Sequence, residues 1–368
     1  MSLTNVLQAC AAALIVVTAL SIWRHDAWWV RMWDFPRAQI VFIGIFLLMA
    51  FFAFPPEKTL GQWIFGLLIA SLALQGWRIY PYTPLAAPQS ILSKSAEGDG
   101  VWSIMVSNVL MDNRHSASLL ELVHQTNPDV FFAVETDQWW AEQLAPLEEL
   151  YPYGVSHPLD NTYGLVLYSR LELVEPEIRH LFEDDVPSVH AQVKLRNGSL
   201  VHVHLLHPKP PVPTESLETT ERDAEILRVG REIGQHDRPT VVAGDLNDVA
   251  WSHTTRLFQR ISGLLDPRVG RGRYSTYHAK IPFVRWPLDH VFHSEHLELV
   301  ALERLPAVGS DHFPILARLN LVPTAPLLQD APDAQPGDFE EAEEKIEAAE
   351  PLAEAPLEEP LIPPPGGP

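Results

Sequence analysis

Several short apolar runs in the sequence end in residues that could do chemistry. VVAGDLND is a β-branched run followed by a glycine and then by Asp245, Asn247 and Asp248. Asn108 ends the run VWSIMVSN, and Glu135 ends DVFFAVE. One polar residue after a strand is an ordinary turn former. The repetition instead predicts that carboxylates and amides gather along one edge of a sheet.

Histidines and further carboxylates follow the same pattern. His207 ends SLVHVHLLH, Asp289 opens LDHVF, and Asp311 and His312 precede PILARL. Hard oxygen ligands suit Mg²⁺ or Mn²⁺, while imidazoles move protons or stabilise developing charge. This inventory indicates hydrolysis of a phosphate ester. A zinc site is disfavoured, because the histidines lack the helical spacing of HExxH.

Four stretches in order, NPDVFFAVE, AGDLND, PLDHVF and GSDHFP, resemble the motifs of the endonuclease/exonuclease/phosphatase superfamily, whose members are deoxyribonuclease I-like. The resemblance covers residues 101 to about 322. It implies an α/β fold, a four-layer sandwich of two mixed β-sheets flanked by helices. It also implies direct attack of water on phosphorus, without a covalent intermediate.

The resemblance further implies a metal site and a set of catalytic residues. Glu135 would bind Mg²⁺ (or Mn²⁺), with Asn108 and Asp311 near the metal.

The catalytic residues implied are His207, Asp245, Asn247, Asp289 and His312. Asp245 would position or activate the attacking water, and Asn247 would hold the phosphate. Asp289 would pair with His312, which contacts the scissile phosphate, and His207 would contact it as well.

Other polar residues near these motifs have structural interpretations. Strand alternation places His202 and His204 on the face opposite His207, so both are predicted to be structural. Asp248 is predicted to cap the helix that begins near WSHTTRLFQRI. The basic and aromatic loop of residues 266–286 either frames an anionic substrate or is a solvated loop, and the sequence leaves both readings open.

Strands and helices alternate across the middle of the chain. Strands are expected at residues 101–108, 129–135, 163–169, 189–195, 199–207, 240–247, 288–294 and 314–321. Amphipathic helices are expected within residues 115–128 and 214–234. This mixture favours an α/β sandwich for the predicted catalytic domain, residues 101–324.

Three apolar stretches at the N-terminus, about residues 6–23, 38–55 and 60–77, are each close to the roughly 20 residues that cross a bilayer. They predict three transmembrane helices within an anchor of residues 1–85, followed by a linker of residues 86–100. The location implied is the inner (plasma) membrane, with the lipid bilayer as a partner. Buried core helices are the alternative.

The side of the membrane on which the domain lies is left open. Three arginines between the first two stretches favour the cytoplasm by the positive-inside rule, but two aspartates lie among them. Bacterial members of the superfamily with a similar N-terminal region of three spans, however, resemble proteins whose catalytic domain lies outside the cytoplasm.

The C-terminal residues 325–368 are acidic and proline-rich, and are predicted to be a disordered tail that allows a short helix near residues 339–349. Residues 101–322 hold 19 Lys and Arg against 30 Asp and Glu, which argues against tight binding of duplex DNA. The single cysteine, Cys10, excludes an internal disulfide.

The sequence thus predicts a membrane-anchored, metal-dependent phosphoesterase. Its substrate would be a nucleic acid, a phospholipid headgroup or a small phosphate ester, and no obligate protein partner is evident. The alternative is an inactive membrane scaffold that binds partners through the same fold and its acidic tail. That alternative is disfavoured, because every motif position carries a competent residue.

Overall fold

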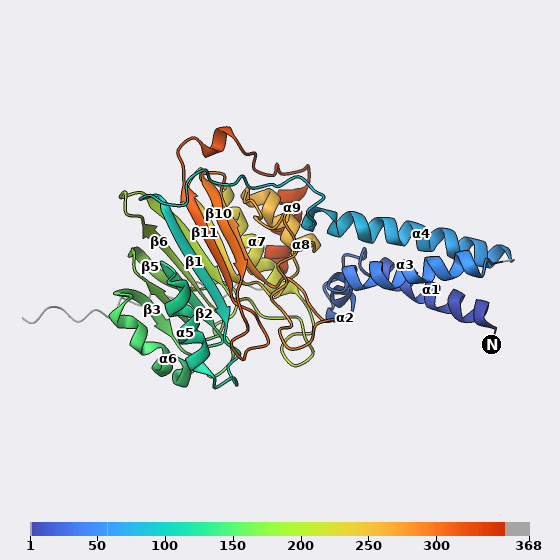
Figure 1. The fold of residues 1–368 in the computed structure, drawn as a ribbon, viewed down its shortest axis with the longest axis horizontal. Helices are drawn as coiled ribbons and strands as arrows, with labels where there is room; N and C mark the ends of the chain where they lie inside the picture. The colour runs from blue at the N-terminus through green and yellow to red at the C-terminus, as the bar shows by residue number, and fades with distance from the viewer. Residues whose placement is uncertain (1, 57, 350–368) are drawn as a thin grey trace, which may run out of the picture.

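The computed structural model describes residues 2–56 and 58–349. Two mixed β-sheets pack face to face, helices cover their outer faces, and a bundle of apolar helices extends from one end (Figure 1). The sheets and their flanking helices confirm the α/β sandwich predicted from the sequence.

The first sheet has six strands, and its only parallel pair joins β1 to β2. Its order is β10 (Leu297–Arg304), β11 (Ile315–Leu321), β1 (Val101–Asn108), β2 (Val130–Val134), β4 (Leu165–Ser169) and β3 (Tyr153–His157). Its outer face packs against α5 (Ser116–Thr126) and α6 (Gln138–Leu144).

The second sheet has five strands, and β7 and β8 are its parallel pair. Its order is β5 (Glu172–His180), β6 (Pro187–Lys194), β7 (Leu200–Leu206), β8 (Thr240–Asp245) and β9 (Asp289–His293). Its outer face packs against α7 (Thr220–Gly234) and α8 (His253–Ser262), and α9 (Asp338–Ala348) packs on these two helices.

The main core lies between the two sheets, where alternate residues of each strand point inward. Ile104 and Val106 of β1 and Val241 and Ala243 of β8 belong to this core. The same alternation continues to the last residue of each strand. It therefore carries polar side chains to the end of the space between the sheets.

All eight predicted strands are present, but β3, β5 and β10 were not predicted. The helix within residues 115–128 ends as expected, with Asn127 in the left-handed region at φ 49°. The prediction for Asp248 is wrong, because the N-cap of α8 is Ser252, whose hydroxyl accepts from the Thr255 amide at 3.0 Å. Asp248 instead accepts hydrogen bonds from the Ser252 and Thr255 hydroxyls.

The N-terminal helices are α1 (Leu3–Leu20), α2 (Trp28–Arg31), α3 (Arg37–Ala53) and α4 (Thr59–Ile79). By length and composition α1 and α4 could each cross a membrane, and α3 is a third candidate if it is counted as one span with residues 28–34, from which it bends by 69°. Short 3-10 helices lie at residues 32–34, 80–82, 145–149 and 325–327. Residues 21–36, between α1 and α3, are called the connector below.

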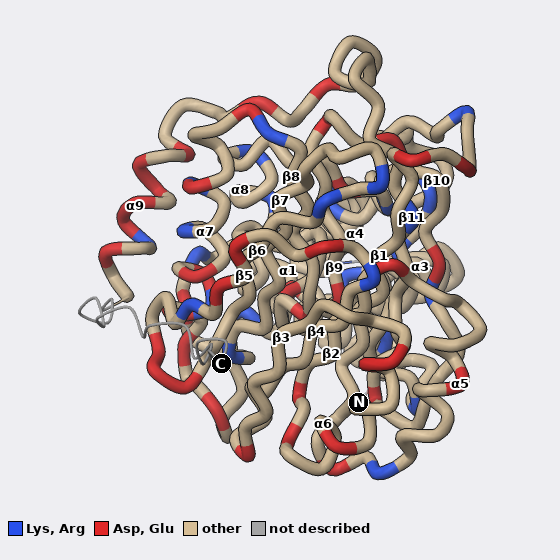
Figure 2. Tube along the Cα trace, turned by 90° about the vertical axis from the view of Figure 1, so that its left-hand side faces the viewer, with Lys and Arg blue, Asp and Glu red and all other residues tan. Residues whose placement is uncertain are grey.

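The composition predicts a disordered C-terminal tail, but part of this segment is helical. Residues 338–348 form α9, close to the short helix that the sequence allowed. Ala342 and Ile346 are buried in the cluster that covers the second sheet, while acidic residues recur along α9 (Figure 2). Residues 350–368 lie outside the described residues.

Candidate active site

Asn108 joins the two sheets at the end of the core between them. Its side-chain amide donates to Glu135 Oε1 at 2.6 Å and to Asp245 Oδ2 at 3.0 Å. Asn108 ends β1 of the first sheet, and Asp245 ends β8 of the second. The predicted convergence of polar strand ends is therefore present in the fold.

The backbone around these residues adopts conformations that orient their side chains. Glu135 and Asn247 lie in the left-handed region, at φ 61° and 50°. Gly244, at φ 145°, packs so closely on β7 that a Cβ would overlap the carbonyl oxygen of Leu206. Only glycine therefore fits at this position of AGDLND, and Asp245 follows it directly.

His312 lies between two buried carboxylates. Its Nδ1 is 2.7 Å from Asp289 Oδ2, and its Nε2 is 3.6 Å from Asp245 Oδ2. Burial alone would lower the pKa of His312, but the charges of Asp289 and Asp245 outweigh it and raise the pKa to about 10. His312 is thus a cation at neutral pH.

His207 is fixed by the backbone of the same motif. Its Nδ1 lies 3.2 Å from the carbonyl oxygen of Asp245. Because a carbonyl only accepts, Nδ1 must carry a proton, which leaves Nε2 for other contacts. His204 instead bonds His190 at 2.7 Å between their Nδ1 atoms, and burial lowers its pKa to about 3.

A cavity of about 450 Å³ covers the site. Six of the eight predicted residues line it, and these are Glu135, His207, Asp245, Asn247, Asp311 and His312. Asn108 and Asp289 are not among the lining residues and are buried. Asn108 contacts the lining residues Glu135 and Asp245, and Asp289 contacts the lining residue His312.

The carboxylates of the site differ in their electrostatics. Burial raises the pKa of Glu135. Burial also disfavours the charged form of Asp245, but His312, His207 and the hydrogen bond from Asn108 outweigh it and lower its pKa. Asp245 is therefore the carboxylate held ready as an anion.

The donor set fits a hard divalent cation. Glu135, Asp245 and Asp289 offer carboxylate oxygens, and Asp289 Oδ1 is buried without a hydrogen-bond partner among the described residues. Ligand atoms of Asp245, Asp289 and His312 lie within 4.8 Å of one another, but a protonated His312 has no free lone pair, so only the carboxylates of this group could bind a metal. Oxygen-rich sites of this kind suit Mg²⁺ or Mn²⁺.

Several site residues were not predicted from the sequence. The Thr276 hydroxyl accepts from the amides of Leu288 and Asp289 at 3.3 and 3.1 Å, and it so fixes the start of β9. The Tyr277 ring lies 5.0 Å from that of His312. Only the aromatic content of loop 266–286 hinted at Tyr277, and nothing in the pattern marked Thr276.

Two of the basic side chains of that loop have structural roles. Arg268 is buried and pairs with Asp266 at 2.8 Å, and Arg271 donates to backbone carbonyls of Pro267 and Ser90. Its aromatic residues Tyr277 and Trp286, by contrast, line the cavity. The hypothesis that the loop frames an anionic substrate is therefore wrong for Arg268 and Arg271.

Residues 105–312 match the model of the Endonuclease/Exonuclease/phosphatase family. The match covers more than half of the chain, so the chain belongs to this family. No curated protein matches the chain.

Solved structures with a similar fold include the human nocturnin catalytic domain with bound sulfate, at 16% identity over 62% of this chain and 97% of that one, with a TM-score of 0.49. TDP2 of D. rerio complexed with a single-strand DNA product is 21% identical over 60% of this chain and 100% of that one, with a TM-score of 0.48. Beta toxin of Staphylococcus aureus is 17% identical over 59% and 99%, with a TM-score of 0.45.

Proposed function

We propose that the protein is a membrane-anchored, divalent-metal-dependent hydrolase of phosphodiester or phosphomonoester bonds. The observation that carries this proposal is that Asp245 lines the cavity together with His312 and is held from the other side by Asn108. An ionised carboxylate beside a cationic imidazole suits the activation of water next to a phosphate.

His312 would bind the scissile phosphate through Nε2, because its Nδ1 is occupied by Asp289. Its positive charge would stabilise the negative charge that develops on the phosphoryl oxygens. Asp245 would orient the attacking water and accept its proton. Asn247 and His207, which line the same cavity, would hold the phosphate.

Glu135 would hold the metal, with Asn108 and Asp311 beside it. When bound, a divalent cation neutralises phosphoryl charge at such a site. Glu135, Asp245 and Asp311 line one cavity, and the charge of Asp245 disfavours the ionised form of Glu135. A divalent cation would compensate this repulsion, which supports the role of Glu135.

Membrane anchoring is supported by the apolar N-terminal helices. Arginines of this region lie at the ends that face the domain, with Arg24 and Arg31 in the connector, Arg37 at the start of α3 and Arg78 near the end of α4, while Lys58 precedes α4 at the opposite end. The remaining length of each helix is apolar, as a span in the plasma membrane requires.

The proposal is tested by assaying the full-length protein in detergent with Mg²⁺ against bis(p-nitrophenyl) phosphate, p-nitrophenyl phosphate and single-stranded DNA. We expect turnover that chelation abolishes and that Mg²⁺ or Mn²⁺ restores. Asp245→Asn should lower kcat by about 100-fold or more. The matched control is Asp237→Asn, because the Asp237 side chain is 89% exposed.

Folded protein without turnover of any phosphate ester would contradict the proposal. It would favour the alternative of a scaffold that binds partners through this fold.

A further inference from the structure

The candidate active-site cavity is bounded in part by the N-terminal connector. Trp28, Met32 and Phe35 line the same cavity as Asp245 and His312. These three residues lie between the first two apolar helices, more than 200 positions before Asp245 in the sequence. The cavity thus has a polar end at the catalytic groups and an apolar end at the connector.

An aromatic wall runs from one end of the cavity to the other. The Phe35 ring meets Trp286 edge to face at 5.5 Å. Trp286 stacks on Tyr277 at 5.8 Å, and Tyr277 lies 5.0 Å from the ring of His312. A ligand in contact with His312 would therefore extend along apolar surface toward the connector.

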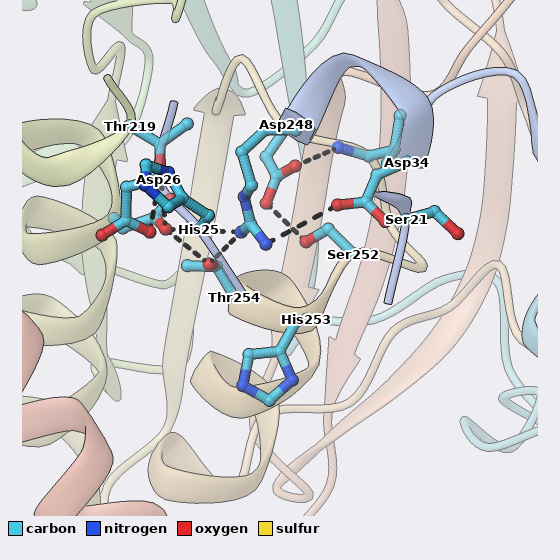
Figure 3. Close-up of polar contacts among 12 residues, drawn as sticks. Ser21, His25, Asp26, Asp34, Thr219, Asp248, Ser252, His253 and Thr254 are labelled. Atoms are coloured by element: carbon cyan, nitrogen blue, oxygen red, sulfur yellow. Dashed lines mark hydrogen bonds and ion pairs between the residues drawn. The ribbon is translucent and has the colours of Figure 1, made fainter. Parts of the chain in front are cut away.

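Buried polar contacts fix the connector to the catalytic domain. Arg31 Nη2 lies 2.9 Å from Thr254 Oγ1 and 3.4 Å from Asp223 Oδ2. The Trp251 indole donates to the carbonyl oxygen of Asp34 at 2.7 Å. Figure 3 shows Asp26 and Asp34 of the connector facing Thr219, Asp248 and Thr254 of the domain.

These contacts make the connector a fixed part of the cavity wall. Arg31 and Asp223 are both buried, so the pair would be costly to break.

The cavity also lies at the level where the proposed spans meet the domain. Gln39, in the first turn of α3, donates to the carbonyl oxygen of Phe283 at 2.9 Å. Phe283 is 87% exposed, and it lines a second hollow together with Phe42 and Ile43 of α3. An exposed aromatic beside the first turns of a span suits the interface between lipid and water.

We propose that the substrate is a membrane lipid carrying a phosphate ester. Its phosphate would reach His312 and Asp245, and the first carbons of its apolar part would rest on Trp28, Met32 and Phe35. This inference rests on the proposed function. It favours a lipid over a nucleic acid, because the apolar end is formed by the connector between two proposed spans and the domain carries excess negative charge.

The test uses the full-length protein reconstituted with Mg²⁺ in phosphatidylcholine vesicles. The vesicles contain phosphatidic acid, phosphatidylglycerol, phosphatidylethanolamine or a polyprenyl phosphate, and release of the water-soluble product is measured. Bis(p-nitrophenyl) phosphate and p-nitrophenyl phosphate are assayed in parallel as soluble esters.

The variants are Trp28→Ala and Met32→Ala, with Trp29→Ala as the matched control. Trp29 is adjacent in α2 and 44% exposed, and it is not among the residues that line the cavity. Met32 is 43% exposed, so its truncation leaves the buried core of the domain intact.

We expect one of the lipids to be hydrolysed. Trp28→Ala and Met32→Ala should each lower kcat/KM for that lipid about tenfold more than for the soluble esters, a difference of about 1.4 kcal/mol. Trp29→Ala should leave the ratio of the two activities unchanged.

Hydrolysis of the soluble esters without hydrolysis of any lipid would overturn the inference and leave the proposed function standing. Equal losses on lipid and soluble ester would also overturn it, and so would efficient cleavage of single-stranded DNA with the same dependence on Trp28. Without turnover of any ester, both proposals fail.

Discussion

Asp245 and Asp289 face each other directly across the antiparallel pairing of β8 with β9, and both carboxylates are buried. Two like charges in this position destabilise a sheet unless a cation compensates them. His312 contacts both, with its two ring nitrogens directed at the two carboxylates. The pairing therefore explains why a histidine at this position is held as a cation.

The pH dependence of catalysis should report this pairing. If His312 acts as a cation, kcat/KM should fall as pH rises through its pKa of about 10. Asp289→Asn removes the carboxylate that contributes most to raising this pKa, so the alkaline limb should move to lower pH by about one unit or more. The measurement is a pH profile of kcat/KM with a soluble ester. An alkaline limb unchanged by the substitution would show that another group titrates.

Gly244→Ala should destabilise the fold, because a Cβ at this position overlaps the backbone of β7 and the residue lies at φ 145°. The expected loss is about 2 kcal/mol or more, read as a lower midpoint of thermal unfolding. Gly198→Ala is the control, since Gly198 also has a positive φ, of 83°, but a Cβ added there would meet no atom within 4 Å. Equal losses for the two variants would mean that φ alone, and not the contact with Leu206, restricts Gly244.

Glu225 should make stability fall with rising pH. Its carboxyl in α7 is buried, and burial together with the charge of Glu183 raises its pKa to about 8. Between the ordinary carboxyl pKa of 4.5 and this value, the unfolded chain releases the proton and the folded chain keeps it. The contribution of Glu225 is therefore complete below the ordinary value and is lost as pH rises through about 8.

Glu225→Gln should remove this dependence. Compared with the unchanged protein, the variant should unfold at a higher temperature above the raised pKa and show little difference at acidic pH. The check is the thermal midpoint as a function of pH for both proteins. Parallel curves would contradict the assignment to Glu225.

The helix α9 should contribute to stability through its apolar side. Ile346 is 6% exposed in the cluster with α7, whereas Phe339 of the same helix is 49% exposed. Ile346→Ala should lower the free energy of unfolding by roughly 2 kcal/mol. Phe339→Ala, a larger truncation, should change it by less than about 0.5 kcal/mol. If the two variants behave alike, α9 does not pack on α7 as described.

The site was predictable from the sequence where a strongly apolar strand ends in a polar residue, as at Asn108, Glu135 and Asp245. Strand β5 was missed because its run ELVEPEIRH lies at a sheet edge and carries exposed glutamates and a proline, so no apolar pattern marks it. The helix α9 was expected to be at most a local helix, since its acidic composition hides the small apolar stripe that docks on α7.

The part played by the connector could not be read from the sequence at all. Trp28, Met32 and Phe35 look like a membrane-interface segment, and their place in the cavity depends on contacts with residues far along the chain. Such long-range contacts leave no local periodicity in the sequence.

A series of ion pairs and one hydrogen bond also links the connector to the backbone of Asn247. Arg31 pairs with Asp223, Asp223 pairs with Arg222 at 2.7 Å, and Arg222 donates to the backbone carbonyl of Asn247 at 2.8 Å. The N-terminal region and the sandwich domain are therefore not separable modules. A chain shortened to begin at Val101 would lose one wall of its cavity and leave Asp223 without its Arg31 partner. Replacing the N-terminal helices and connector with an unrelated hydrophobic segment would therefore change the candidate active site itself.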